Sequence, residues 1–84
     1  MVSKTPDGLR EAAPTGDVVT DYDRAHLQLY IRLLDARSAG KSSDDMCRFV
    51  LEIDPDGDPD GAHKLLKSHL ERAAWMSSIG FRQI

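Results

Sequence analysis

The residues best suited to chemistry are the aspartates of the segment IDPDGDPDG, residues 53–61. Asp56, Asp58 and Asp60 alternate with other residues as the first ligands of a calcium-binding loop do. In such a loop the twelfth residue is a bidentate glutamate, but this position holds Lys67. Because a cation in place of the principal ligand opposes calcium binding, we interpret the aspartates as a solvated turn that caps the next helix.

Two other patterns that resemble chemical sites are incomplete. Residues 40–42, Gly-Lys-Ser, end like a phosphate-binding loop, but the first glycine of that motif is replaced by Asp35. His63 and His69 are six residues apart and point in opposed directions on one helix, whereas a zinc-binding pair prefers a spacing of four. Cys47 has no orienting partner and is typical of a small buried hydrophobic residue. We therefore predict no catalytic, cofactor-binding or metal-binding residues and no enzyme.

The overall composition indicates one small domain that carries a slight negative charge. The chain has 84 residues, a formal net charge of −3 and one cysteine. This length allows one domain with little room for a deep substrate pocket, so no small-molecule substrate is expected. The single cysteine cannot form an intrachain disulfide, and no apolar run suggests a signal peptide or membrane span. These features predict a cytoplasmic protein with no membrane partner.

Helical periodicity and capping residues predict three helices after a flexible, disordered tail over residues 1–19. The first helix begins after Thr20 and ends near Gly40. The second follows a serine cap and ends before Pro55, and the third runs over residues 59–78. Residues 20–84 are therefore predicted to form an all-α, compact three-helix, helix-turn-helix-like domain.

The spacing of apolar residues predicts which side chains form the core. In the second helix the stripe of Met46, Phe49, Val50 and Ile53 is expected to face inward. The residues predicted to be most deeply buried are Leu33, Phe49, Leu66 and Leu70.

Some apolar residues exceed what the core requires and are candidates for partner binding. The first helix carries a second apolar stripe with Tyr30, Ile31 and Leu34, although a surface helix needs only one. Trp75 lies off the apolar face of the third helix; it is either covered by Phe81 and Ile84 or anchors a partner. The acidic turn could pair with basic residues of that partner. The predicted partner-binding residues are Tyr30, Ile31, Leu34, Asp56, Asp58, Trp75 and Met76.

Residues 22–82 contain three motifs, YDRxHLxxYxRLLDA, xVLxIDP and SHLxRAxWMxxxGFR. They resemble a proteobacterial family of short proteins and C-terminal domains. Its members include helix-turn-helix-like, DNA-binding domains of transcription activators from conjugative elements and secretion-system loci. The chain is also similar to short antiactivators of integrative and conjugative elements. This resemblance implies a protein that binds transcription activator proteins, namely a LuxR-type quorum-sensing regulator and an activator with a related domain, and so represses transfer.

The alternative is a small helix-turn-helix regulator that binds DNA itself. The start of the third helix would then enter the major groove, with His63, Lys64, Lys67 and Arg72 facing DNA. Against this, residues 20–84 contain eleven acidic and nine basic residues, and four aspartates lie at the same end of the helix. Because carboxylates repel the phosphate backbone, we expect DNA binding to be weak or absent.

Overall fold

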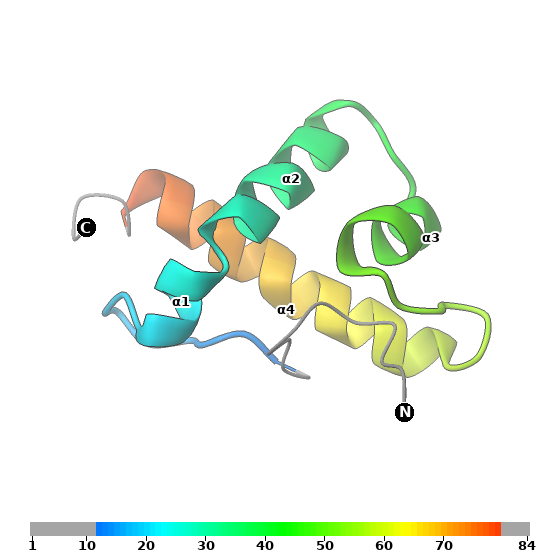
Figure 1. The fold of residues 1–84 in the computed structure, drawn as a ribbon, viewed down its shortest axis with the longest axis horizontal. Coiled ribbons are helices and arrows are strands. Elements are labelled where there is room, and N and C mark those ends of the chain that lie inside the picture. Colours follow the sequence, from blue (N-terminus) through cyan, green and yellow to red (C-terminus); the bar gives the residue numbers. More distant parts are fainter. Residues whose placement is uncertain (1–11, 80–84) are drawn as a thin grey trace.

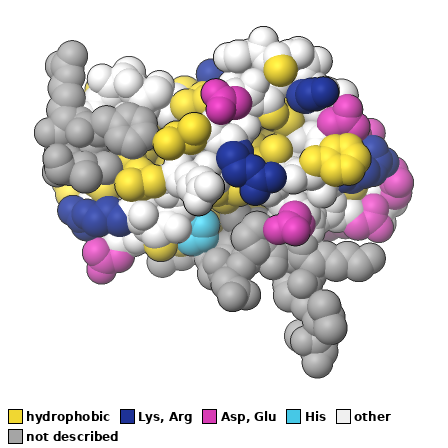
Figure 2. Space-filling view, turned by 45° about the horizontal axis from the view of Figure 1, so that its top comes forward, with side chains coloured by type: hydrophobic (Ala, Val, Ile, Leu, Met, Phe, Trp, Pro, Cys, Tyr) yellow, Lys and Arg dark blue, Asp and Glu magenta, His cyan; other side chains and the backbone are white. Residues whose placement is uncertain are grey.

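A computed structural model describes residues 12–79, which form helices and the segments that connect them, with no strand within that range. The helices are α1 (Asp21–Ala25), α2 (Leu27–Ser38), α3 (Ser43–Asp45), η1 (Met46–Leu51) and α4 (Pro59–Ser78). In Figure 1, α2, α3 and η1 lie on one side of α4, which is the longest helix. Figure 2 looks onto that side, where hydrophobic and charged side chains are both visible. The all-α, compact fold class predicted from the sequence is confirmed.

The first predicted helix is divided into α1 and α2 at His26. Its start is as predicted, because the Thr20 hydroxyl accepts a hydrogen bond from the Asp23 main chain while the Asp23 carboxylate accepts from the Thr20 main chain. At His26 the backbone leaves the helical conformation, with φ −117° and ψ 20°. The His26 ring donates to the Tyr22 carbonyl at 2.8 Å, which stabilises this break. Because of this break, the axis of α1 need not continue that of α2.

The second predicted helix starts at Ser42 but has a different register from the one expected. The Ser42 side chain caps α3, and η1 then follows as a π-helix of six residues. A π-helix has more residues per turn than an α-helix, so its inward face follows another spacing. Glu52 ends η1 with φ 58°, a left-handed conformation. The inward residues of η1 are Met46, Cys47, Val50 and Leu51.

Phe49 therefore does not belong to the core, and this prediction is wrong. Its side chain is 68% exposed, whereas Leu51 is fully buried. The stripe assumed from the sequence and the observed one share Met46 and Val50, so α-helical periodicity alone does not distinguish them. Ile53 lies beyond the left-handed turn at Glu52 and so outside the helix, but its side chain still packs, partly buried, against the core, as the sequence predicts.

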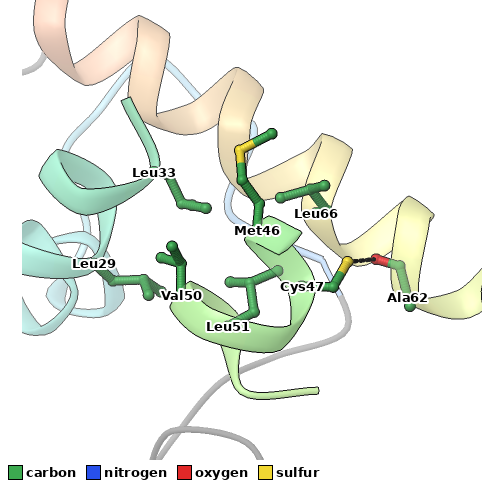
Figure 3. Close-up of a cluster of buried hydrophobic side chains, with 8 residues drawn as sticks. All are labelled: Leu29, Leu33, Met46, Cys47, Val50, Leu51, Ala62 and Leu66. Carbon is green, nitrogen blue, oxygen red and sulfur yellow. Dashed lines mark hydrogen bonds between the residues drawn. The ribbon is translucent and has the colours of Figure 1, made fainter. Parts of the chain in front are cut away.

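The main hydrophobic core is formed where η1 packs between α2 and α4. Leu33 and Leu66 are buried there as predicted, whereas Leu70 is only half-buried. Figure 3 shows the side chains from the three helices pointing toward one another. The Cys47 thiol lies in this core and donates to the Ala62 carbonyl at 3.7 Å. Burial raises the pKa of this thiol.

The third predicted helix is confirmed as α4, and its start is the one expected from the sequence. The Asp58 side chain accepts from the Gly61 main chain at 3.1 Å, and Pro59 occupies the first helical position. α4 spans the whole domain and contributes to both buried clusters.

Residues 12–19 pack against α4 and thus differ from the flexible tail expected there. The side chains of Ala13 and Val19 are buried, and the Ala13 main chain donates to the Ser68 hydroxyl at 2.6 Å. Arg72 donates to the carbonyls of Gly16 and Val18. The packed domain therefore begins before Thr20, and the rest of the predicted tail, residues 1–11, lies outside the described residues.

The register of η1 predicts unequal effects of two substitutions within this helix. Leu51→Ala should lower the free energy of unfolding by about 2–5 kcal/mol, because it leaves a cavity in the core. Phe49→Ala should change it by about 0.5 kcal/mol or less, because the ring is mostly in solvent. Urea denaturation of both variants measures the difference. A larger loss for Phe49→Ala than for Leu51→Ala would contradict the register.

Candidate protein-interaction surface

The predicted partner-binding residues are distributed between the core and the surface. Tyr30 and Met76 are fully buried, so their assignment to a partner surface is wrong for this fold. The two apolar stripes of the first helix suggest a free face, but one stripe packs into the main core and the other, with Tyr30, packs with Met76 into a second buried cluster. Leu34 is half-buried against that cluster, and Ile31 is 49% exposed. Ile31 is therefore the best exposed of the candidates on α2.

Trp75 is held within the domain by α4 and the N-terminal segment. Its ring lies 3.9 Å below the Arg72 guanidinium and packs against the second buried cluster. A shallow pocket beside it is lined by Pro14, Thr15 and Ser68 among others. Trp75 is half-buried through these contacts. Phe81 and Ile84, which the sequence offers as its cover, lie outside the described residues.

The two aspartates predicted to bind a partner are already engaged within the chain. Asp56 accepts from the Arg48 guanidinium at 3.0 Å, and Asp58 caps α4. They precede α4, whereas Trp75 lies near its other end, roughly 26 Å away at 1.5 Å per helical residue. The predicted residues therefore do not form one site. Among residues 12–79, no three His, Cys, Asp or Glu side chains are grouped so that they could hold a metal ion.

A buried ion pair lies at the junction of α1, α2 and α4. Arg72 donates to both oxygens of the Asp23 carboxylate, at 3.0 and 2.7 Å, and Tyr30 donates to it at 2.7 Å. Burial alone would raise the pKa of Asp23, but the hydrogen bonds from Arg72, the Thr20 main chain and Tyr30 outweigh it and lower that pKa well below 3.8. Burial and the Asp23 carboxylate raise the pKa of Tyr30. Every buried side-chain polar atom of the described residues has a hydrogen-bond partner. Because none of them is left to bind a ligand, we interpret this network as one that joins the helices.

A second buried polar contact joins α1 to α4 through His69. Its Nδ1 donates to the Leu65 carbonyl at 2.8 Å, and its Nε2 accepts from the Tyr22 hydroxyl at 2.6 Å. The Tyr22 ring stacks on His26, with ring centroids 4.1 Å apart. Burial lowers the pKa of His69 below 6.5, so the ring is neutral at pH 7.

The exposed residues best suited to contact another protein lie on α2 and η1. Phe49 is 68% exposed and Ile31 49%, and both belong to helices that are fixed by the core. Arg32 joins them, since it follows Ile31 on α2 and its guanidinium donates to the Phe49 carbonyl at 3.0 Å. In Figure 2, hydrophobic side chains on this face flank a Lys or Arg side chain near the centre of the view. We call Ile31, Arg32 and Phe49 the α2–η1 surface.

A small groove extends the α2–η1 surface beside the Phe49 ring. Ala36, Met46 and Val50 supply apolar walls, and Lys41 and Asp45 supply opposite charges at its edge. Its volume is about 190 Å³, which is enough for one apolar side chain. The π-helix creates this arrangement because it directs Phe49 outward while its neighbours fill the core. Phe49 was not predicted at the surface, because a stripe with Phe49 and Ile53 and a stripe with Cys47 and Leu51 both have helical spacing in this segment.

Comparison of the sequence with models of protein families and with curated proteins finds no match. No helix within residues 12–79 is long and apolar enough to cross a membrane.

The buried His69 predicts a loss of stability at mildly acidic pH. Below about pH 6.5 the unfolded chain binds a proton at this residue that the folded chain does not, so the free energy of unfolding falls as the pH drops. The loss has a slope of up to about 1.4 kcal/mol per pH unit and ends below the lowered pKa of the folded state. It is separate from the loss expected below pH 3.8, where Asp23 titrates in the unfolded chain.

Urea denaturation between pH 7.5 and 5 measures this slope. The His69→Gln variant should lose most of the slope, because glutamine does not titrate, whereas His63→Gln at an exposed position should keep it. An unchanged slope in His69→Gln would show that another group is responsible.

Proposed function

We propose that this chain is a non-enzymatic, QseM-like antiactivator in the cytoplasm that represses transfer of an integrative and conjugative element. Its partners in this proposal are transcription activators, namely a LuxR-type quorum-sensing regulator and an activator with a related domain. The observation that carries the proposal is Phe49, a large aromatic side chain that a well-packed helix presents to solvent. The sequence motifs quoted above supply the identity of the partners.

The composition of the α2–η1 surface supports protein binding. Aromatic residues and arginine dominate the residues that contribute most to protein–protein affinity, and Phe49 and Arg32 lie in contact here. Because both helices are fixed by the core, little conformational entropy is lost when a partner covers them. No bond needs to be made or broken: the domain acts by occupying the activator's DNA-binding or assembly face.

The alternative, direct binding to DNA, has less support in the charges of the folded chain. Arg72, which the sequence places on a DNA-facing surface, is buried and bonded to Asp23. Arg48 is paired with Asp56. Lys64 and Lys67 remain exposed on α4, but Asp58 and Asp60 lie at its start, where the helix would approach phosphates. We therefore propose that DNA binding is weak or absent.

The antiactivator proposal predicts that Phe49 contributes strongly to binding the activator. Phe49→Ala should weaken binding of the purified LuxR-type regulator by about 30-fold or more, corresponding to about 2 kcal/mol, without loss of the fold. Isothermal titration calorimetry measures the affinity, and circular dichroism on the same sample checks the helices. Val18→Ala is the matched control, because Val18 is equally exposed at 68% but lies on the N-terminal segment. Equal affinities of wild type and Phe49→Ala would overturn this role.

The charge arrangement predicts how DNA binding responds to substitution. Wild-type protein should bind nonspecific duplex only weakly, at low salt. Replacing Asp54, Asp56, Asp58 and Asp60 by asparagine should strengthen that binding, because it removes four carboxylates and releases Arg48. Asparagine also caps helices well, so α4 should keep its start. Fluorescence anisotropy against salt concentration measures both proteins, and tight, sequence-selective binding by the wild type would favour the DNA-binding alternative.

A further inference from the structure

We infer that the α2–η1 surface binds a protein segment that presents a carboxylate between apolar side chains, with the carboxylate opposite Arg32. This inference rests on the proposed function, because it concerns the partner bound at the same surface. It adds the chemistry that the partner must have.

The inference begins with the charge of Arg32. Arg24, Arg48 and Arg72 each have a carboxylate partner, namely Asp21, Asp56 and Asp23. Within residues 12–79, the Arg32 guanidinium is hydrogen-bonded to the Phe49 carbonyl and contacts no carboxylate. Most of its donors therefore face solvent.

A partner that covers the two apolar residues must also cover this cation. Arg32 follows Ile31 on α2 and reaches the main chain of Phe49 on η1, so its guanidinium adjoins both residues that carry the exposed apolar side chains. A buried guanidinium without an acceptor is strongly unfavourable, and the partner must therefore supply one. A carboxylate is the best match, because it can accept two parallel hydrogen bonds from a guanidinium.

The groove beside Phe49 favours a protein over a nucleic acid as the occupant. Its walls are the apolar side chains of Ala36, Met46 and Val50, and it has room for one apolar side chain. A duplex offers phosphates along its backbone but no flexible apolar side chain to fill this groove, and the opposite charges of Lys41 and Asp45 at its edge give phosphates no net attraction. A segment with apolar side chains on both sides of an acidic residue satisfies the groove, Ile31 and Arg32 together.

The test is selection from a phage-displayed library of random 16-residue peptides, with the whole chain as bait and the Phe49→Ala variant for counter-selection. Enriched peptides should carry Asp or Glu flanked by large apolar residues. Changing that acidic residue to its amide in a synthetic peptide should weaken binding about tenfold or more, because a charge-assisted pair is lost. With Arg32→Glu as bait, the preference should change to Lys or Arg.

Arg24→Glu is the matched control, since Arg24 is an exposed helical arginine outside this surface, and it should keep the preference for acidic peptides. Absence of enrichment, enrichment without acidic residues, or the same acidic preference with Arg32→Glu would each overturn the inference. An Arg32→Gln variant that keeps its affinity for the peptide but loses affinity for nonspecific duplex would also overturn the inference. The library result does not depend on the activator, so failure of the LuxR-type regulator to bind overturns the proposed function separately.

Discussion

The fold depends above all on the ion pair between Arg72 and Asp23. One guanidinium joins α4 to α1 through the Asp23 carboxylate, to the N-terminal segment through two carbonyls, and to the Trp75 ring through its face. Tyr30 connects α2 to the same carboxylate. Removal of one member would leave a buried charge without its partner, which typically costs about 3–5 kcal/mol. For a small domain this is a large fraction of the total stability.

This polar junction also determines which side of the domain can meet a partner. Because α1, the N-terminal segment and α4 are held around Arg72, the Trp75 side of α4 is partly covered by the chain itself. The opposite end, where η1 packs on α2, is held mainly by the apolar core and leaves Phe49 and Ile31 in solvent. The structural and the proposed binding roles thus fall on different residues. Variants of the binding surface can for this reason be studied without disturbing the junction.

Local signals in the sequence were sufficient for the fold class and for the starts of the three predicted helices. Thr20, Ser42 and Asp58 each cap the helix expected, because a capping side chain acts within three residues of its own position. The inward face of η1 was not predictable in this way, since two apolar stripes fit the same segment and only tertiary packing selects one. The burial of Arg72, which the DNA-binding alternative places on a DNA-facing surface, was not predictable because an arginine is rarely buried without a partner and its partner is 49 residues away in the chain. Of the three residues of the α2–η1 surface, the sequence predicted only Ile31 as a partner-binding residue.

The position of Cys47 allows the opening of the core to be measured by the rate of a chemical reaction. It is the only cysteine in the chain, it is fully buried between η1 and α4, and burial raises the pKa of its thiol. Since a thiolate is the reactive species, an alkylating reagent must wait until η1 separates from α4. The rate of alkylation therefore reports how often this contact opens in the native protein. A bound partner that touches η1 should slow that reaction even though the thiol itself lies on the opposite, inward side of the helix.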